Sequence, residues 1–151
     1  MRPRRRSPLV LLLALGVALA ATLSVALAAW SWAQAQDPPR TRTVVITIHW
    51  SRFQPSEVRM TQGDTVRFVI HNTDPIDHEF ILGDEQVQDA HEHGTQASHD
   101  GSVPGQVSIP AGQTRTTTYT FERPLSLAYA CHLPGHYRYG MVGVVRVTAS
   151  G

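Results

Sequence analysis

Short stretches in which apolar and polar residues alternate recur along the chain from residue 43 onward. Residues 65–72 read TVRFVIHN and place Val66, Phe68 and Ile70 on one face, as expected of a strand with one buried side. Similar β-branched or alternating runs occupy residues 43–50, 57–60, 78–82, 106–110, 114–121, 125–131 and 141–149. Because turn formers separate these runs, the pattern predicts an all-β domain, a Greek-key β-sandwich or barrel of about seven or eight strands.

One long polar stretch, residues 83–105, interrupts this pattern without a clear period of its own. It exceeds the usual loop length, so we expect either a functional loop or a short helix within it. It contains His91, His93 and His99, which could form a second metal site. A solvated loop whose histidines make ordinary polar contacts is the alternative, because no spacing here is diagnostic of a metal.

The N-terminus has the features of an export signal. Four arginines within residues 2–6 precede an apolar run from Leu9 to Ala29, and Ala33-Gln34-Ala35 has the small-x-small form of a cleavage site. We therefore predict a signal peptide over residues 1–35. The apolar run is also long enough for an uncleaved membrane anchor. In both cases the rest of the chain is expected outside the cytoplasm, in the periplasm or extracellular space, or tethered to the outer face of the cytoplasmic membrane.

After the leader, residues 36–42 form a polar, proline-containing tether, and residues 43–151 are long enough for one domain. Beyond residue 35 the chain has nine arginines, no lysine and 12 acidic residues. Nucleic-acid binding needs a basic surface, so this charge balance excludes that class of function.

Cys131 is the only cysteine, which excludes an intramolecular disulfide. It lies in the segment YACHLPGHYRYGM, five residues before His136, which itself precedes Met141 by five. Cys131 ends one predicted strand and Met141 begins the next, so the loop between them brings thiolate, imidazole and thioether together. His78, after the loop NTDPID, is placed to add a second imidazole. One thiolate, two imidazoles and a weak thioether are the ligands of a blue-copper site, whereas zinc would leave the methionine unexplained.

Residues 55–80 and the segment YACHLPGHYRYGM resemble the cupredoxins, the family of plastocyanin, azurin and auracyanin, with a ligand spacing closest to that of auracyanin. The resemblance implies a cupredoxin fold and one type 1 copper, with His78, Cys131 and His136 as equatorial ligands and Met141 as the axial ligand.

The resemblance also implies a docking surface, and at one position the sequence departs from the family. His136 would reach the surface within an apolar patch that includes Leu133 and Pro134, and it would serve as the electron port. Cupredoxins such as azurin carry asparagine after the first histidine, where it ties the two ligand loops together. This chain has Glu79 instead, which changes the surroundings of the predicted ligands.

The sequence therefore predicts an exported, monomeric type 1 copper protein that carries single electrons between redox protein partners and transforms no substrate. The alternative is a copper chaperone or buffer that uses His91, His93 and His99 as an additional site. Copper stoichiometry separates the two functions, because a carrier would bind one copper and a buffer more than one.

Overall fold

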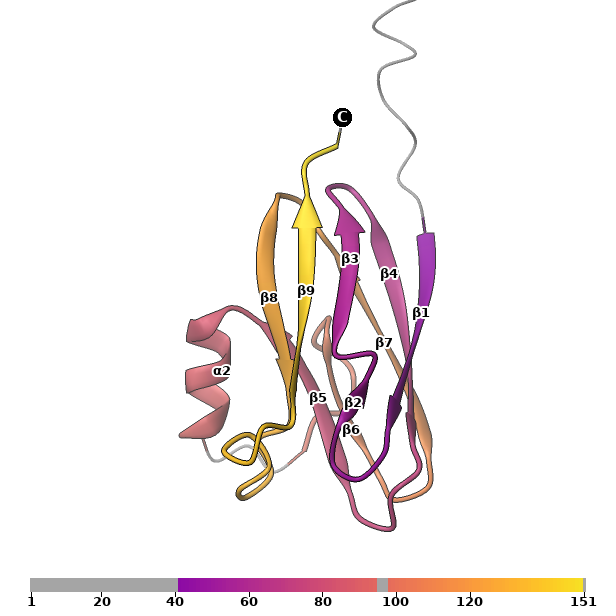
Figure 1. Ribbon diagram of the computed structural model, residues 1–151, viewed down its shortest axis with the longest axis vertical. Coiled ribbons are helices and arrows are strands. Elements are labelled where there is room, and N and C mark those ends of the chain that lie inside the picture. The colour runs from indigo at the N-terminus through magenta and orange to yellow at the C-terminus, as the bar shows by residue number, and fades with distance from the viewer. Residues whose placement is uncertain (1–40, 95–97, 151) are drawn as a thin grey trace, which may run out of the picture. The chain divides into compact units, whose positions relative to one another are not determined.

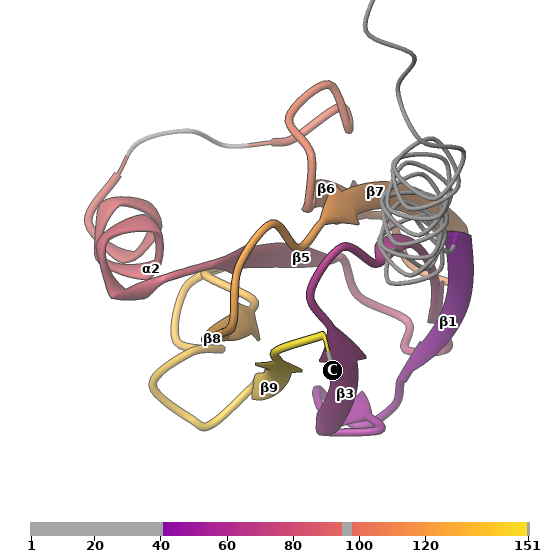
Figure 2. The same ribbon diagram turned by 90° about the horizontal axis from the view of Figure 1, so that it is seen from above.

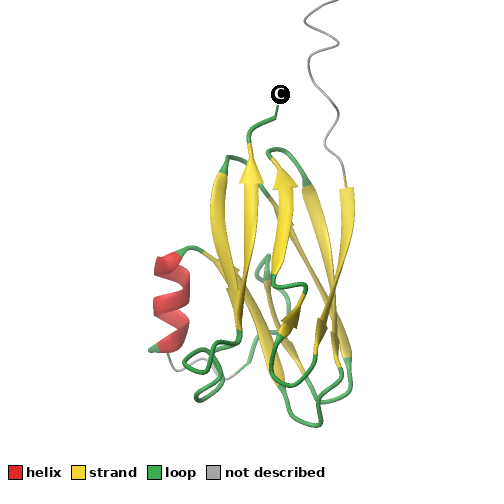
Figure 3. Cartoon of the chain, viewed as in Figure 1, coloured by secondary structure: helices red, strands yellow, loops and turns green. Residues whose placement is uncertain are grey.

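Two β-sheets pack face to face in the computed structural model, which describes residues 41–94 and 98–150 (Figures 1 and 3). The first sheet has the order β2-β1-β4-β7 and the second β3-β9-β8-β5-β6. Strands β1 and β4 pair in parallel, as do β3 and β9. The strands are β1 Thr41–Ile48, β2 Phe53–Gln54, β3 Glu57–Thr61, β4 Thr65–Asn72, β5 His78–Gly83, β6 Gln106–Ile109, β7 Thr114–Thr120, β8 Leu125–Ala130 and β9 Val142–Thr148.

Alternating side chains from the two sheets fill the space between them. Val66, Phe68 and Ile70 of β4 are fully buried, as their spacing predicted. Across the core, the ring of Phe68 in β4 lies against that of Phe80 in β5, with centroids 5.1 Å apart. The predicted β-sandwich is thus confirmed, and its packed core gives the loops at each end a rigid base.

Strand β5 is buried along its whole length because helix α2, Glu85–Glu92, contacts β5 and β8. Figure 2 shows the helix beside these two strands, outside the second sheet. Gln88 is buried on the helix, and its side-chain amide donates to the backbone oxygens of Ile81 and Ala128 at 3.0 and 3.1 Å. The polar stretch 83–105 therefore contains the short helix that was one of its two expected forms.

One strand boundary and one short strand differ from the sequence prediction. Strand β1 begins at Thr41, inside the predicted tether, and the two-residue strand β2 was not predicted, because Phe53 and Gln54 are too few to show a period. The predicted leader, residues 1–35, lies outside the described residues. Over residues 41–94 and 98–150 the structure has no helix that is both long and apolar enough to span a membrane.

The loops that follow β1, β4 and β8 lie at one end of the sandwich, the lower end in Figure 1, whereas the turn between β3 and β4 lies at the other. His78, Cys131 and His136 all belong to the lower end, which the topology therefore makes the candidate functional end.

The pairing of β8 with β9 leads to a prediction about stability. Gly143 lies opposite Tyr129, and a Cβ at residue 143 would lie 2.2 Å from the Tyr129 Cζ. Gly143→Ala must displace the ring, so we expect the free energy of unfolding to fall by about 1–3 kcal/mol in urea denaturation. Val142→Ala is the control, because Val142 is 40% exposed. Equal stability of Gly143→Ala and the wild type would contradict the packing described here.

Candidate metal centre

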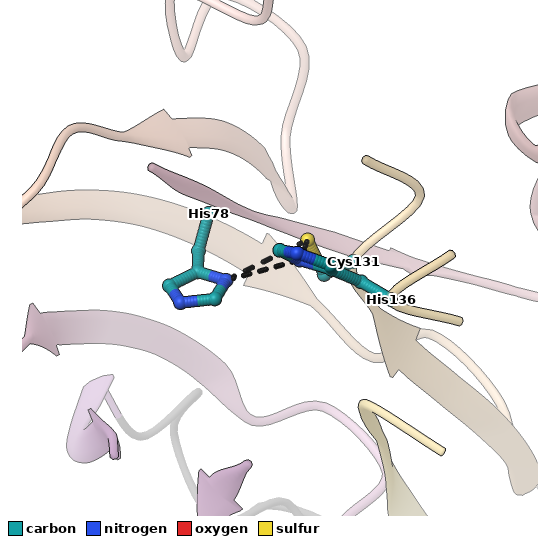
Figure 4. Close-up of side chains that lie close together, drawn as sticks. All are labelled: His78, Cys131 and His136. Carbon is teal, nitrogen blue, oxygen red and sulfur yellow. Dashed lines mark hydrogen bonds between the residues drawn. The ribbon is translucent and has the colours of Figure 1, made fainter. Parts of the chain in front are cut away.

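Three side chains from two segments of the chain converge at the lower end of the sandwich (Figure 4). His78 begins β5, Cys131 directly follows β8, and His136 lies in the loop between β8 and β9. His136 Nδ1 lies 3.2 Å from both the Cys131 Sγ and the His78 Nδ1, and the Cys131 Sγ lies 4.0 Å from the His78 Nδ1. Among the described residues, this is the one group of His, Cys, Asp or Glu side chains whose ligand atoms come close enough to hold a metal ion.

Met141 lies directly beside this group and is fully buried. Its backbone N–H donates to the His136 oxygen at 3.0 Å, and its own oxygen accepts from the Cys131 N–H at 3.3 Å. These two bonds close the loop on itself, so the spacing of cysteine, histidine and methionine in the sequence becomes a compact cluster in the fold.

The donor set fits a soft, redox-active metal. A buried thiol and two imidazole nitrogens face a common point, and the thioether of Met141 belongs to the same loop. This combination favours copper over metals that prefer oxygen ligands. Burial lowers the pKa of His78, although hydrogen bonding to Asp74 opposes the shift. The ring is therefore neutral near neutral pH and available as a ligand.

The Cys131 thiol stays protonated in the absence of a metal. Burial raises the pKa of Cys131 to about 12, even though the backbone N–H groups of Glu79 and Leu133 donate toward the sulfur and favour the thiolate. Because the thiolate is the reactive form, a protonated, buried thiol resists oxidation. This accounts for an unpaired cysteine in a chain predicted to be exported.

Glu79 provides the connection that asparagine provides in cupredoxins such as azurin. Its Oε1 accepts from the backbone N–H of His132 at 2.8 Å, and the side chain is buried. The residue after the first histidine is thus bonded to the residue after the cysteine. The departure seen in the sequence changes the charge beside the ligands but keeps the two ligand segments tied.

Two of the three histidines in residues 83–105 lie together, and the third does not. His91 and His99 lie together with ring centroids 5.0 Å apart, and His132 adds a third ring 5.9 Å from that of His91. His93, however, has a side chain that is 76% exposed and pairs with Asp89. The three residues proposed as a second metal site therefore do not converge.

The surface around His136 differs in part from the expected apolar patch. Pro134 is exposed, but Leu133 is half-buried and packs against the core. Tyr139 is 76% exposed and is the most prominent aromatic side chain of the loop. His136 itself is half-buried, so the loop offers a mixed surface beside the candidate ligand.

Asp74 belongs to this site, and the sequence analysis missed it. Its side chain is 7% exposed, and its Oδ2 lies 3.0 Å from the His78 Nε2. Burial disfavours its charge, but hydrogen bonds from the backbone of Ser51 and Trp50 and from His78 keep the pKa of Asp74 below its usual range. The only signal in the sequence is an aspartate four residues before the first ligand, in a loop where aspartate is common for other reasons.

The fold and this donor set are those of a cupredoxin. A sequence profile for copper-binding proteins of the plastocyanin/azurin family matches residues 43–148. The chain belongs to that family, and copper is therefore the metal that we assign to the site. Zinc, the alternative that the ligand types left open, has no support from the family.

The chain is also similar to individual proteins of known name. It is 38% identical over 109 residues to the "Copper-resistant cuproprotein CopI" of Rubrivivax gelatinosus, an alignment that covers 70% of this chain and 66% of that protein. A protein of the same name from Pseudomonas aeruginosa is 29% identical over 138 residues, covering 71% and 76% respectively. The chain thus spans about two thirds to three quarters of these relatives.

Solved structures support the fold. Auracyanin B superposes with a TM-score of 0.59 at 23% identity, covering 75% of this chain and 92% of that one. A reduced auracyanin from Roseiflexus castenholzii gives the same TM-score at 20% identity, covering 74% and 99%. At these identities the likeness establishes the architecture and nothing finer.

The raised pKa of Cys131 predicts how copper binding depends on pH. Because the thiol keeps its proton up to about pH 12, thiolate coordination must release that proton. Between about pH 7.5 and 9, where imidazoles are largely neutral, the apparent Cu(II) affinity should rise about tenfold per pH unit. Competition against a chelator of known protonation behaviour measures this slope. An affinity independent of pH over that range would show that Cys131 does not bind the metal.

Proposed function

We propose that this protein handles copper outside the cytoplasm and contributes to copper tolerance by holding one copper ion in the site of His78, Cys131, His136 and Met141. The observation that supports this most directly is the 38% identity, over 70% of the chain, to a relative named as a copper-resistant cuproprotein. The site described above is the feature of this chain that such a role would use.

The geometry suits retention of copper better than exchange at the surface. His78 and Cys131 are buried, and the pair is fixed by backbone and carboxylate hydrogen bonds from both ligand segments. A preformed group needs little rearrangement when the ion enters, and a buried group protects the ion from other ligands. Copper bound there would supply one-electron chemistry between its two oxidation states.

A single tight site is the form of copper handling that we propose. A buffer that binds further ions through His91, His93 and His99 finds less support, because His93 is exposed and paired with Asp89 while His91 and His99 lie together elsewhere. We therefore expect one copper per chain. Placement outside the cytoplasm rests on the signal-like residues 1–35 of the sequence.

Electron carriage between redox proteins is the second candidate function. One observation favours it: His136 is half-buried in a loop that also presents Tyr139 with 76% exposure. Such a loop could bring a partner close to a metal ligand. In this role the protein would be a monomeric carrier and not an enzyme, and its partners would be membrane-bound or soluble redox proteins.

Two variants separate these functions in a bacterial strain made copper-sensitive by deletion of its own related cuproprotein. Cys131→Ser removes the thiolate and should fail to restore growth on copper. Tyr139→Glu places a charge on the exposed loop, leaves the donors in place, and should restore growth as well as the wild type does. Growth and the copper content of each purified variant are the measurements.

Different results would contradict the two candidate functions. If Tyr139→Glu binds one copper in vitro but does not restore growth, the loop surface is required and electron carriage is favoured. If Cys131→Ser restores growth, the tolerance does not depend on this site and the proposed function is wrong.

A further inference from the structure

We propose that Asp74 is a positioning residue of the copper site, which fixes the tautomer of His78 and lowers the reduction potential through its negative charge. The proposal rests on copper binding at His78, but it is independent of whether the protein serves copper tolerance or electron carriage.

The carboxylate of Asp74 is held on all sides by hydrogen bonds. Its Oδ1 accepts from the Trp50 N–H at 2.8 Å, and its Oδ2 accepts from the Ser51 N–H at 2.7 Å and lies 3.0 Å from the His78 Nε2. The backbone N–H of Asp74 donates to the Asn72 Oδ1 at 3.0 Å. This carboxylate therefore has little freedom to leave the imidazole.

Asn72 anchors the loop that carries Asp74. Its side-chain amide donates to the backbone oxygens of Ile76 and Ile109 at 2.8 and 3.0 Å, and the side chain is buried. The backbone oxygen of Asp74 accepts from the Gly112 N–H at 3.2 Å. The loop between β4 and β5 is thus hydrogen-bonded to the loop between β6 and β7, just before the chain reaches His78.

The contact with Asp74 determines which nitrogen of His78 is free. An ionised carboxylate can only accept hydrogen bonds, so the proton of the neutral ring lies on Nε2. The lone pair then lies on Nδ1, the atom that faces Cys131 and His136. Without this partner a buried ring could take the other tautomer, which would turn an N–H toward the metal position.

The charge of Asp74 has a second consequence. A carboxylate behind a metal-bound imidazole makes the ring a stronger electron donor. A stronger donor favours the more highly charged Cu(II) over Cu(I), so the carboxylate should lower the reduction potential. Because the side chain is 7% exposed, water screens this charge only weakly.

The same carboxylate holds an unusual turn between β1 and β2. Trp50 and Ser51 have φ values of 52° and 51°, in the left-handed region that residues other than glycine rarely adopt. Both donate their backbone N–H to Asp74. Such conformations persist where the surroundings enforce them, and they cluster at functional sites. The turn and the ligand His78 therefore depend on one side chain.

Asp74→Asn tests the proposal, because it keeps the size of the side chain and removes the charge. We expect the Cu(II) affinity to fall by about 10–100-fold and the reduction potential to rise, since Cu(II) loses more stabilisation than Cu(I). Asp64→Asn is the matched control: Asp64 is also buried and accepts from the Thr61 N–H and Arg42, but it lies in the turn at the opposite end (Figure 1). The control should lose stability and leave both copper properties unchanged.

A second variant separates the effect on copper from any loss of folding stability in Asp74→Asn. Ser51→Gly relaxes one left-handed residue, so Asp74→Asn combined with Ser51→Gly should fold more stably and still show the raised potential. An unchanged potential and Cu(II) affinity in a folded Asp74→Asn variant would overturn the proposal.

The tautomer can be measured without copper, which separates this proposal from the proposed function. Nitrogen-15 NMR of the metal-free wild-type protein should show that His78 is protonated on Nε2 and unprotonated on Nδ1. A proton on Nδ1 would overturn the proposal, whatever role the copper site has in the cell.

Discussion

The structure depends on bringing the donor atoms of one thiol and two imidazoles, those of Cys131, His78 and His136, to a common point. Backbone bonds between Cys131, His136 and Met141 close one loop, and Glu79 joins the two ligand segments through His132. The β-sandwich supplies the rigid base, because the strands that lead into these loops are packed in its core. The donor atoms therefore lie close together in the protein by itself.

The fold was predictable because alternation is a local property. In β4 each buried residue is two positions from the next, and that spacing is visible in the sequence alone. Strand β2 was missed since two residues carry no period. The helix at Glu85–Glu92 was only one of two expectations, because its polar residues gave no clear apolar face.

The grouping of the candidate ligands could be predicted from the sequence, whereas their surroundings could not. Cys131, His136 and Met141 lie in one loop, so their spacing in the sequence reflects their spacing in the fold. Asp74 bonds to residues 23 and 24 positions earlier, and no local pattern records such a contact. The same holds for His91, His99 and His132, whose rings meet because the helix packs on β5 and β8 and because His99 bonds to Ser108 of β6.

The central claim is that a copper thiolate forms at Cys131 with one copper per chain. The most direct test is titration of the purified protein lacking residues 1–35 with Cu(II), followed by absorption spectroscopy and metal analysis. We predict an intense red-region band that reaches its maximum at one equivalent and is bleached by ascorbate. A colourless protein, or one that takes up two or more tightly bound coppers, would contradict the account.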